Sequence, residues 1–241
     1  MKRFWEIDFL RGIAIITMIV FHFLSDIVLL GKYNLNLDSG FWFYFGRITA
    51  IIFLLLVGIS LNISYSRLKT KSFKKYLKRG LKIFSWGLLL TLLTFIFFKE
   101  GFIVFGILHL IGISIIAAYP FLKHPYFSLL IGLVFITRGI FLIKETADFP
   151  YLMWLGLKPE NFSTIDYYPI IPWFGVVLIG IFLGNLLYKN NIRRFKIWDL
   201  SKISFIRFFS FLGKHSLLIY LIHQPILIII LYIFGIVSLP I

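Results

Sequence analysis

The stretch RGIAIITMIVFHFLSD (residues 11–26) places an arginine and a histidine within the first apolar run that is long enough to cross a membrane. Burying a cation and an imidazole in lipid is costly, so such side chains usually face a cavity or a partner. At about 100° per residue, the steps from Arg11 to His22 return to within about 20° of the same helix face, about 16 Å further along the axis. The stretch therefore predicts one membrane helix that presents both side chains in the same direction.

The rest of the chain has a similar composition. Of its 241 residues, 60% are hydrophobic and 20% aromatic, and 29 are phenylalanines. A soluble globular domain could not bury that much apolar surface, whereas repeated apolar runs of this length are typical of membrane spans. We therefore expect an all-α fold, a polytopic membrane helical bundle that forms one domain over residues 1–241. The chain has no cysteine, which excludes disulfides, thiolate metal sites and thiol nucleophiles.

About seven transmembrane helices are predicted, and their orientation follows from charge. Lysine and arginine concentrate in alternate connections, which by the positive-inside rule predicts a cytoplasmic N-terminus. The acidic residues beside the first apolar run also predict that this helix is not cleaved. The net charge of +15 does not indicate nucleic-acid binding, because most basic residues flank the membrane. The expected spans cover residues 8–30, 41–65, 80–98, 101–121, 125–143, 169–188 and 214–236.

Two inner segments are strongly basic. RLKTKSFKKYLKRGLK (residues 67–82) spaces apolar residues at helical intervals among lysines and arginines, and residues 189–207 are similarly basic. Both predict helices lying on the inner membrane surface, held by anionic lipids of the bilayer. An alternative for residues 67–82 is that they also receive the phosphates of a cytoplasmic cofactor.

Several other polar side chains fall within or beside the expected spans. A lone membrane histidine is often only a packing residue, and Arg47 could pair with Asp26 merely to neutralise both charges. Histidines and arginines at compatible depth nevertheless favour proton-transfer chemistry, because histidine accepts protons near neutral pH. No metal is expected, since the deep histidines lie on three different helices without a local ligand pair. Beyond Arg11 and His22, the candidate site residues are Asp26, Arg47, His109, Arg138, Asp166, Trp173 and His223.

Four motifs, taken in order, resemble a known family. They are RFWEIDFLRGIAIITMIVFHFLSDI (residues 3–27), GILHLIGIS (106–114), DYYPIIPWFG (166–175) and LGKHSLLIYLIHQPILI (212–228). Together they resemble the catalytic domain of heparan-α-glucosaminide N-acetyltransferases in its short prokaryotic form. The spacing of Arg11 and His22 is also similar to that in the wider clan of transmembrane acyltransferases, including those that O-acylate cell-surface polysaccharides.

The resemblance implies a multi-pass acyltransferase of the cell membrane. Such enzymes move an acetyl or other acyl group from cytoplasmic acyl-CoA, here acetyl-CoA, to an extracytoplasmic sugar, glycan or glycolipid. It implies that His22 is the catalytic histidine and that Arg11 helps to bind the CoA phosphates, with acyl-CoA as co-substrate and no permanently bound cofactor. Asp26 would orient or charge-stabilise His22. The remaining candidates would line the acceptor pocket or stabilise the thioester oxyanion.

One departure from the family changes what is expected. In the animal enzymes the active histidine comes from a luminal segment beyond the first helix, where this chain has Lys32-Tyr33-Asn34. We therefore expect chemistry like that of the O-acyltransferase branch, with His22 as general base. An acylated His22 intermediate, a transporter or flippase with deep charges along its path, and a structural subunit of an envelope-synthesis complex remain alternatives. The oligomeric state stays open, a homodimer included.

Overall fold

The computed structural model describes residues 3–31, 33–68, 70–98, 101–142, 145–147, 150–160, 162–189 and 192–237. Residues 32, 69, 143 and 190–191, which fall within segments discussed above, lie outside this description. In chain order the elements are α1 (Trp5–Leu30), α2 (Gly40–Ser66), α3 (Phe73–Phe97), α4 (Ile107–Ala117), the 3-10 helix η1 (Tyr119–Lys123), α5 (Pro125–Leu142), the 3-10 helix η2 (Pro150–Leu155), α6 (Ile170–Leu187), the two-residue strands β1 (Tyr188–Lys189) and β2 (Ile192–Arg193), α7 (Ser204–Lys214) and α8 (Ser216–Ile233).

The fold is a polytopic helical membrane bundle, as the composition predicts. Among the described residues, six helices are long and apolar enough to cross a membrane, namely α1, α2, α3, α5, α6 and α8. Each coincides with one of the expected spans to within a few residues, apart from the start of α3. Arg11 and His22 lie on one uninterrupted helix.

The expected span 101–121 differs from the structure. Its helix, α4, has 11 residues and is about 16 Å long, roughly half the thickness of the hydrocarbon core. Residues 101–106 are irregular rather than helical, and they bond to the segment before α6: Ile165 N–H donates to the Gly101 carbonyl at 2.9 Å, and Tyr168 N–H donates to the Phe105 carbonyl at 2.9 Å. Residues 101–121 are therefore apolar in composition but do not form a full membrane span.

The basic stretch 67–82 does not form a separate surface helix. α3 begins at Phe73 and continues without a break into the apolar span. Tyr76 is buried and lies beside Tyr65 and Tyr119, with ring centroids 6.4 and 5.3 Å away. The first turns of α3 are thus anchored by an aromatic cluster as well as carrying basic side chains.

The basic segment 189–207 also differs from the expected helix. It begins with the short antiparallel pair β1–β2, and its helical part is α7, which starts only at Ser204. α7 is strongly amphipathic. Ile206, Ser210 and Gly213 are buried, whereas Phe205, Phe208 and Phe211 are each more than half exposed.

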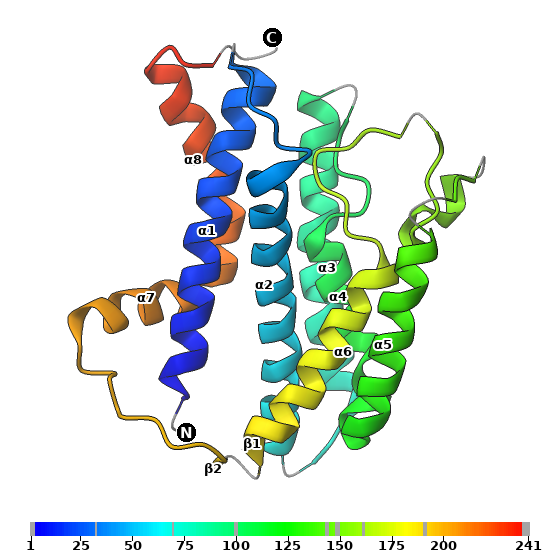
Figure 1. Cartoon of the computed structure of the whole chain (residues 1–241), viewed down its shortest axis with the longest axis vertical. Helices are drawn as coiled ribbons and strands as arrows, with labels where there is room; N and C mark the ends of the chain where they lie inside the picture. The colour runs from blue at the N-terminus through cyan, green and yellow to red at the C-terminus, as the bar shows by residue number, and fades with distance from the viewer. Residues whose placement is uncertain are drawn as a thin grey trace. The chain divides into compact units, whose positions relative to one another are not determined.

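The chain divides into two compact units. Unit 1 comprises residues 1–56 and 197–241, and unit 2 comprises residues 57–196, so α2 contributes to both. In unit 1, α7 runs across the N-terminal half of α1 (Figure 1). The crossing is close because it uses glycines: a Cβ at Gly12 would overlap the Phe209 carbonyl, and a Cβ at Gly213 would overlap the Asp8 carbonyl.

Unit 2 is built from neighbouring helix pairs. α3 packs beside α4, and α5 packs beside α6 (Figure 1). Glycines again allow close approach: Gly132 and Gly175 face each other between α5 and α6, and Gly184 of α6 lies against Asn62 of α2. Small residues serve this purpose in membrane bundles, because they let helix backbones approach.

Candidate functional site

Two of the predicted histidines meet in unit 1. His22 of α1 and His223 of α8 have ring centroids 5.0 Å apart, with their planes inclined at 59°. His223 is buried, with 7% of its surface exposed. The two helices therefore bring two proton-accepting imidazoles together inside unit 1.

The hydrogen bonding of His223 fixes which nitrogen is free. Its Nδ1 lies 2.6 Å from the Tyr220 carbonyl oxygen, which can only accept, so Nδ1 carries the proton. In the neutral ring the lone pair is therefore on Nε2. That atom is buried and has no hydrogen-bond partner among the described residues. A histidine whose Nδ1–H is held by an acceptor can accept a hydrogen bond at Nε2.

Asp26 lies one turn beyond His22 and is bonded to Gln224. The Gln224 Nε2 group donates to Asp26 Oδ1, linking α1 to α8 beside the histidine pair. Asp26 is only 3% exposed. Within the described residues the structure places no hydrogen bond between Asp26 and His22, and Asp26 bonds to the side-chain amide of Gln224, the residue after His223.

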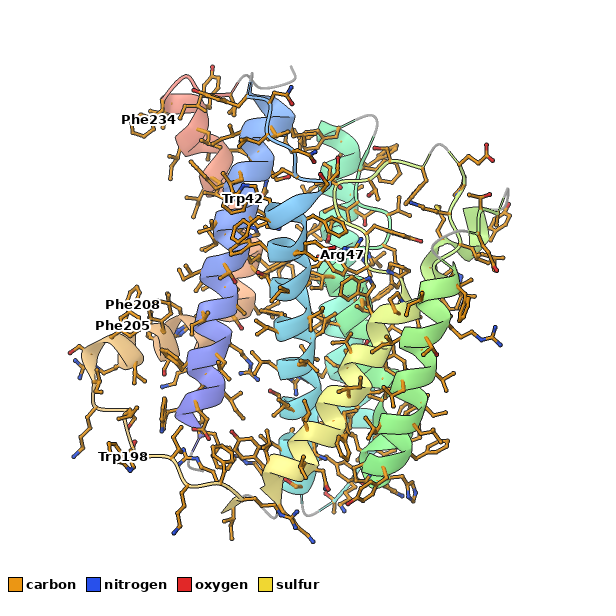
Figure 2. The ribbon with its side chains drawn as sticks, in the orientation of Figure 1. Trp42, Arg47, Trp198, Phe205, Phe208 and Phe234 are labelled. Carbon is orange, nitrogen blue, oxygen red and sulfur yellow. The ribbon has the colours of Figure 1, made fainter. Side chains whose placement is uncertain are left out.

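The three candidate arginines are placed differently. Arg11 Nη1 lies 3.4 Å from Asp8 Oδ1 in an i,i+3 ion pair, and its side chain is 25% exposed. Arg47, labelled on α2 in Figure 2, stacks over the Phe43 ring at 4.7 Å. Arg138 is exposed on α5 of unit 2. Arg11 thus lies on α1 as predicted, and its guanidinium group forms an ion pair with the Asp8 carboxylate.

In unit 2, His109 has a structural position at the start of α4. The Gly106 N–H donates to His109 Nδ1 at 3.2 Å, so Nε2 carries the proton and faces Thr91 Oγ1 at 3.4 Å. The ring stacks on Phe105, with centroids 5.6 Å apart. Both ring nitrogens of His109 take part in hydrogen bonds. We therefore expect this side chain to stabilise the first turn of α4 and not to accept a proton.

Asp166 also holds the start of α4. Its Oδ2 accepts a hydrogen bond from the Ile107 N–H at 3.0 Å. Burial raises the pKa of Asp166 to about 6, against the hydrogen bond from Ile107, which lowers it. The neighbouring aromatic candidate, Trp173, is buried and packs edge-on against Tyr168, with centroids 4.9 Å apart.

The raised pKa of Asp166 predicts a pH dependence of stability. Since its pKa is higher in the folded protein than the ordinary 3.8, folding is favoured most below pH 4 and loses this contribution as the pH rises through 6. A difference of about two pKa units corresponds to at most about 3 kcal/mol. We expect the apparent Tm in detergent to fall between pH 5 and 7, and Asp166→Asn to reduce that fall. An unchanged pH profile in the variant would contradict the assignment.

The chain matches one known protein family over most of its length. Residues 3–225 match the family described as heparan-alpha-glucosaminide N-acetyltransferase, catalytic. The chain belongs to this family. No curated protein and no solved structure matches it. The matched range includes His22, Asp26, His109, Asp166, His223 and Gln224.

Membership identifies an acetyltransferase-like protein of the membrane. It agrees with the resemblance carried by the four sequence motifs, and it favours a transferase over a transporter. The roles of the individual candidate residues stay predictions, which the contacts of His22, His223 and Asp26 make more specific.

Sequence reasoning overlooked two residues that the structure brings into contact with the candidates. Gln224 binds Asp26, and Tyr220 supplies the carbonyl that fixes the His223 ring. An amide inside an apolar span is itself unusual, so the sequence Ile222-His223-Gln224 contained a signal for the first. The contact between Tyr220 and His223 involves a backbone carbonyl, so no side chain in the sequence indicates it.

Proposed function

We propose that the protein transfers an acetyl group from acetyl-CoA, bound on the cytoplasmic side, to a sugar, glycan or glycolipid on the other side of the cell membrane. The observation that carries this proposal is the pair of imidazoles His22 and His223, with the Nε2 lone pair of His223 unpartnered among the described residues. The family supports the acetyl group and the sugar, because its description names an N-acetyltransferase of an α-glucosaminide.

In the proposed reaction His22 is the general base. The acceptor N–H or O–H group attacks the thioester carbonyl carbon, a C–N or C–O bond forms, and His22 takes the proton. The C–S bond then breaks, its electron pair stays on sulfur, and the CoA thiolate takes the proton back from His22. The products are the acetylated acceptor and CoA.

His223 and Asp26 support His22 in this step. Once protonated, the His22 ring would be stabilised by the neighbouring His223 ring, whose Nε2 is unpartnered among the described residues, and by the Asp26 carboxylate one turn away. Stabilising the charge that develops on a base is the usual role of groups placed behind a catalytic histidine.

Arg11 is proposed to bind the CoA phosphates. It lies about 16 Å from His22 along α1, a separation that suits a ligand with its charged end at one site and its reacting end at the other. Its ion pair with Asp8 holds the side chain partly exposed, at 25%.

Replacing Arg11 tests the donor site. We expect Arg11→Ala to weaken the binding of acetyl-CoA to purified protein in nanodiscs by about 10- to 100-fold, since each tenfold corresponds to about 1.4 kcal/mol and a charged hydrogen bond contributes about that much. Lys202→Ala, which removes an exposed basic side chain of the same unit, serves as the control. Equal affinity of wild type and Arg11→Ala would contradict this role, and no binding by the wild type would contradict the use of acetyl-CoA.

Contact with anionic lipid is part of the same proposal and is supported by α7. Figure 2 labels Phe205 and Phe208 on this helix, and both side chains are more than half exposed. At 100° per residue, Arg207 and Lys214 fall within about 20° of each other on a neighbouring edge. Aromatic and basic edges side by side are typical of a helix lying in the membrane interface. A polarity-sensitive label at Phe208→Cys, in a chain without other cysteines, should report an apolar environment; an aqueous one would contradict the contact.

A further inference from the structure

Three buried hydrogen-bond acceptors, on His223 and on two residues beside the histidine pair, have no donor in the described part of the chain. They are Asp26 Oδ2, Gln224 Oε1 and His223 Nε2, none of which has a hydrogen-bond partner among the described residues. Asp26 and His223 are only 3% and 7% exposed. All three atoms have the same requirement, because each needs an N–H or O–H group.

Leaving such atoms unsatisfied is unusual in a folded protein. The great majority of buried polar atoms are hydrogen-bonded, and each one that is not destabilises the fold. Inside a membrane bundle the effect is greater for a carboxylate, which is expected to face a partner or a cavity. The arrangement is therefore suited to a ligand that brings hydrogen-bond donors.

The geometry restricts where those donors bind. The Gln224 amide is held by its own bond to Asp26 Oδ1, so Asp26 Oδ2 and Gln224 Oε1 are left as the free oxygens of one linked pair. His223 is the adjacent residue on α8, and its ring is 5.0 Å from that of His22. Asp26 lies four residues after His22 on α1, so a donor group bound at the linked pair is about one helix turn from the proposed base.

At the reacting end, the acceptor is the substrate whose chemistry matches these atoms. The reacting end of acetyl-CoA offers a carbonyl oxygen and a sulfur, which are acceptors. The acceptor substrate offers hydroxyl or amino groups, which are donors. We infer that Asp26 and Gln224 form the subsite that binds the N–H or O–H groups of the acceptor and positions one of them at His22. The identity of the ligand in this inference rests on the proposed function, and the location of the subsite rests on the unpartnered atoms.

The test separates acceptor binding from donor binding. The probes are methyl α-glucosaminide, chosen from the family description, and acetyl-CoA. The variant is Asp26→Asn, which keeps the size of the side chain but removes the charge and one acceptor oxygen. Asp38→Asn, an exposed carboxylate of the same unit, is the matched control. Full-length protein in nanodiscs is used throughout.

We expect Asp26→Asn to raise the KM for the glucosaminide at least tenfold and to leave the KM for acetyl-CoA within twofold of the wild-type value. We also expect the glucosaminide alone to raise the apparent Tm of the wild type and of Asp38→Asn but not that of Asp26→Asn. Asp26→Glu, which restores the carboxylate, should recover part of the lost affinity. If Asp26→Asn does not fold, Gln224→Met, which has a similar length and no hydrogen-bonding amide, is measured in the same way.

The outcomes distinguish this inference from the proposed function. Equal changes in both KM values, or glucosaminide binding that survives in Asp26→Asn, would overturn the subsite. Glucosaminide binding that depends on Asp26, without any acetyl transfer by the wild type, would support the subsite and overturn the proposed transferase. Acetyl transfer by the wild type, together with an unchanged KM for the glucosaminide in Asp26→Asn, would support the proposed transferase and overturn the subsite.

Discussion

His22→Ala is expected to lower the rate of acetyl transfer by about 10²- to 10⁴-fold, the usual contribution of a positioned general base. The reason is local: His22 is the histidine that carries the Arg11 spacing, and its ring lies 5.0 Å from that of His223. Transfer is measured as labelled acetyl groups on methyl α-glucosaminide, with protein in proteoliposomes. Binding of acetyl-CoA should stay close to that of the wild type, because the variant removes a base and leaves Arg11 in place.

A third histidine of unit 1, outside the proposed site, provides the control. His215 is exposed at the end of α7, and its Nδ1 lies 2.9 Å from the Phe211 carbonyl. His215→Ala removes the same side chain at a position outside the proposed site, and we expect its transfer rate to stay within about twofold of the wild type. Full activity in His22→Ala would move the role of base to His223, and an equal loss in both variants would indicate an effect on folding.

Gly213→Ala is expected to destabilise unit 1 strongly. A Cβ at Gly213 would overlap the backbone carbonyl of Asp8, and neither α7 nor α1 has a flexible side chain there that could move aside. Overpacking of this kind typically costs about 1–3 kcal/mol and occasionally more. The apparent Tm in detergent should fall by about 5 °C or more, and Gly12→Ala, at the facing position of the crossing, should behave similarly.

The control for this crossing lies on the same helix. Ser204 is exposed in the first turn of α7, so Ser204→Ala should change the apparent Tm little. Because the crossing is next to Arg11, we also expect Gly213→Ala to weaken acetyl-CoA binding. Wild-type stability in Gly213→Ala would show that α7 does not pack on α1 through these glycines.

The spans could be predicted because hydropathy reports burial in lipid directly. It identified α1, α2, α5, α6 and α8 closely. It overestimated the span at 101–121, since hydropathy does not register that residues 101–106 satisfy their backbone through the segment before α6. The turns of α3 before residue 80 were read as a surface helix for a similar reason: the basic residues hid a helix that continues into the span.

The site was predictable only in part. Helical spacing placed His22 and Asp26 on one face of α1, but periodicity does not say which helix lies opposite that face. The pairing with α8, the bond to Gln224 and the proton position on His223 all depend on that neighbour. The sequence could not show that His109 is a structural residue. A deep histidine with both ring nitrogens hydrogen-bonded has the same sequence pattern as one with a free nitrogen.

The most direct test of the transferase is the release of CoA. The chain contains no cysteine, so a thiol reagent detects only the free thiol of the product. With wild-type protein in proteoliposomes, acetyl-CoA and methyl α-glucosaminide, we predict thiol release that requires the sugar and equals the acetyl groups found on it. The His22→Ala, His223→Ala double variant should show none, and His215→Ala should match the wild type. Wild-type release in the double variant, or no sugar-dependent release by the wild type, would contradict the account.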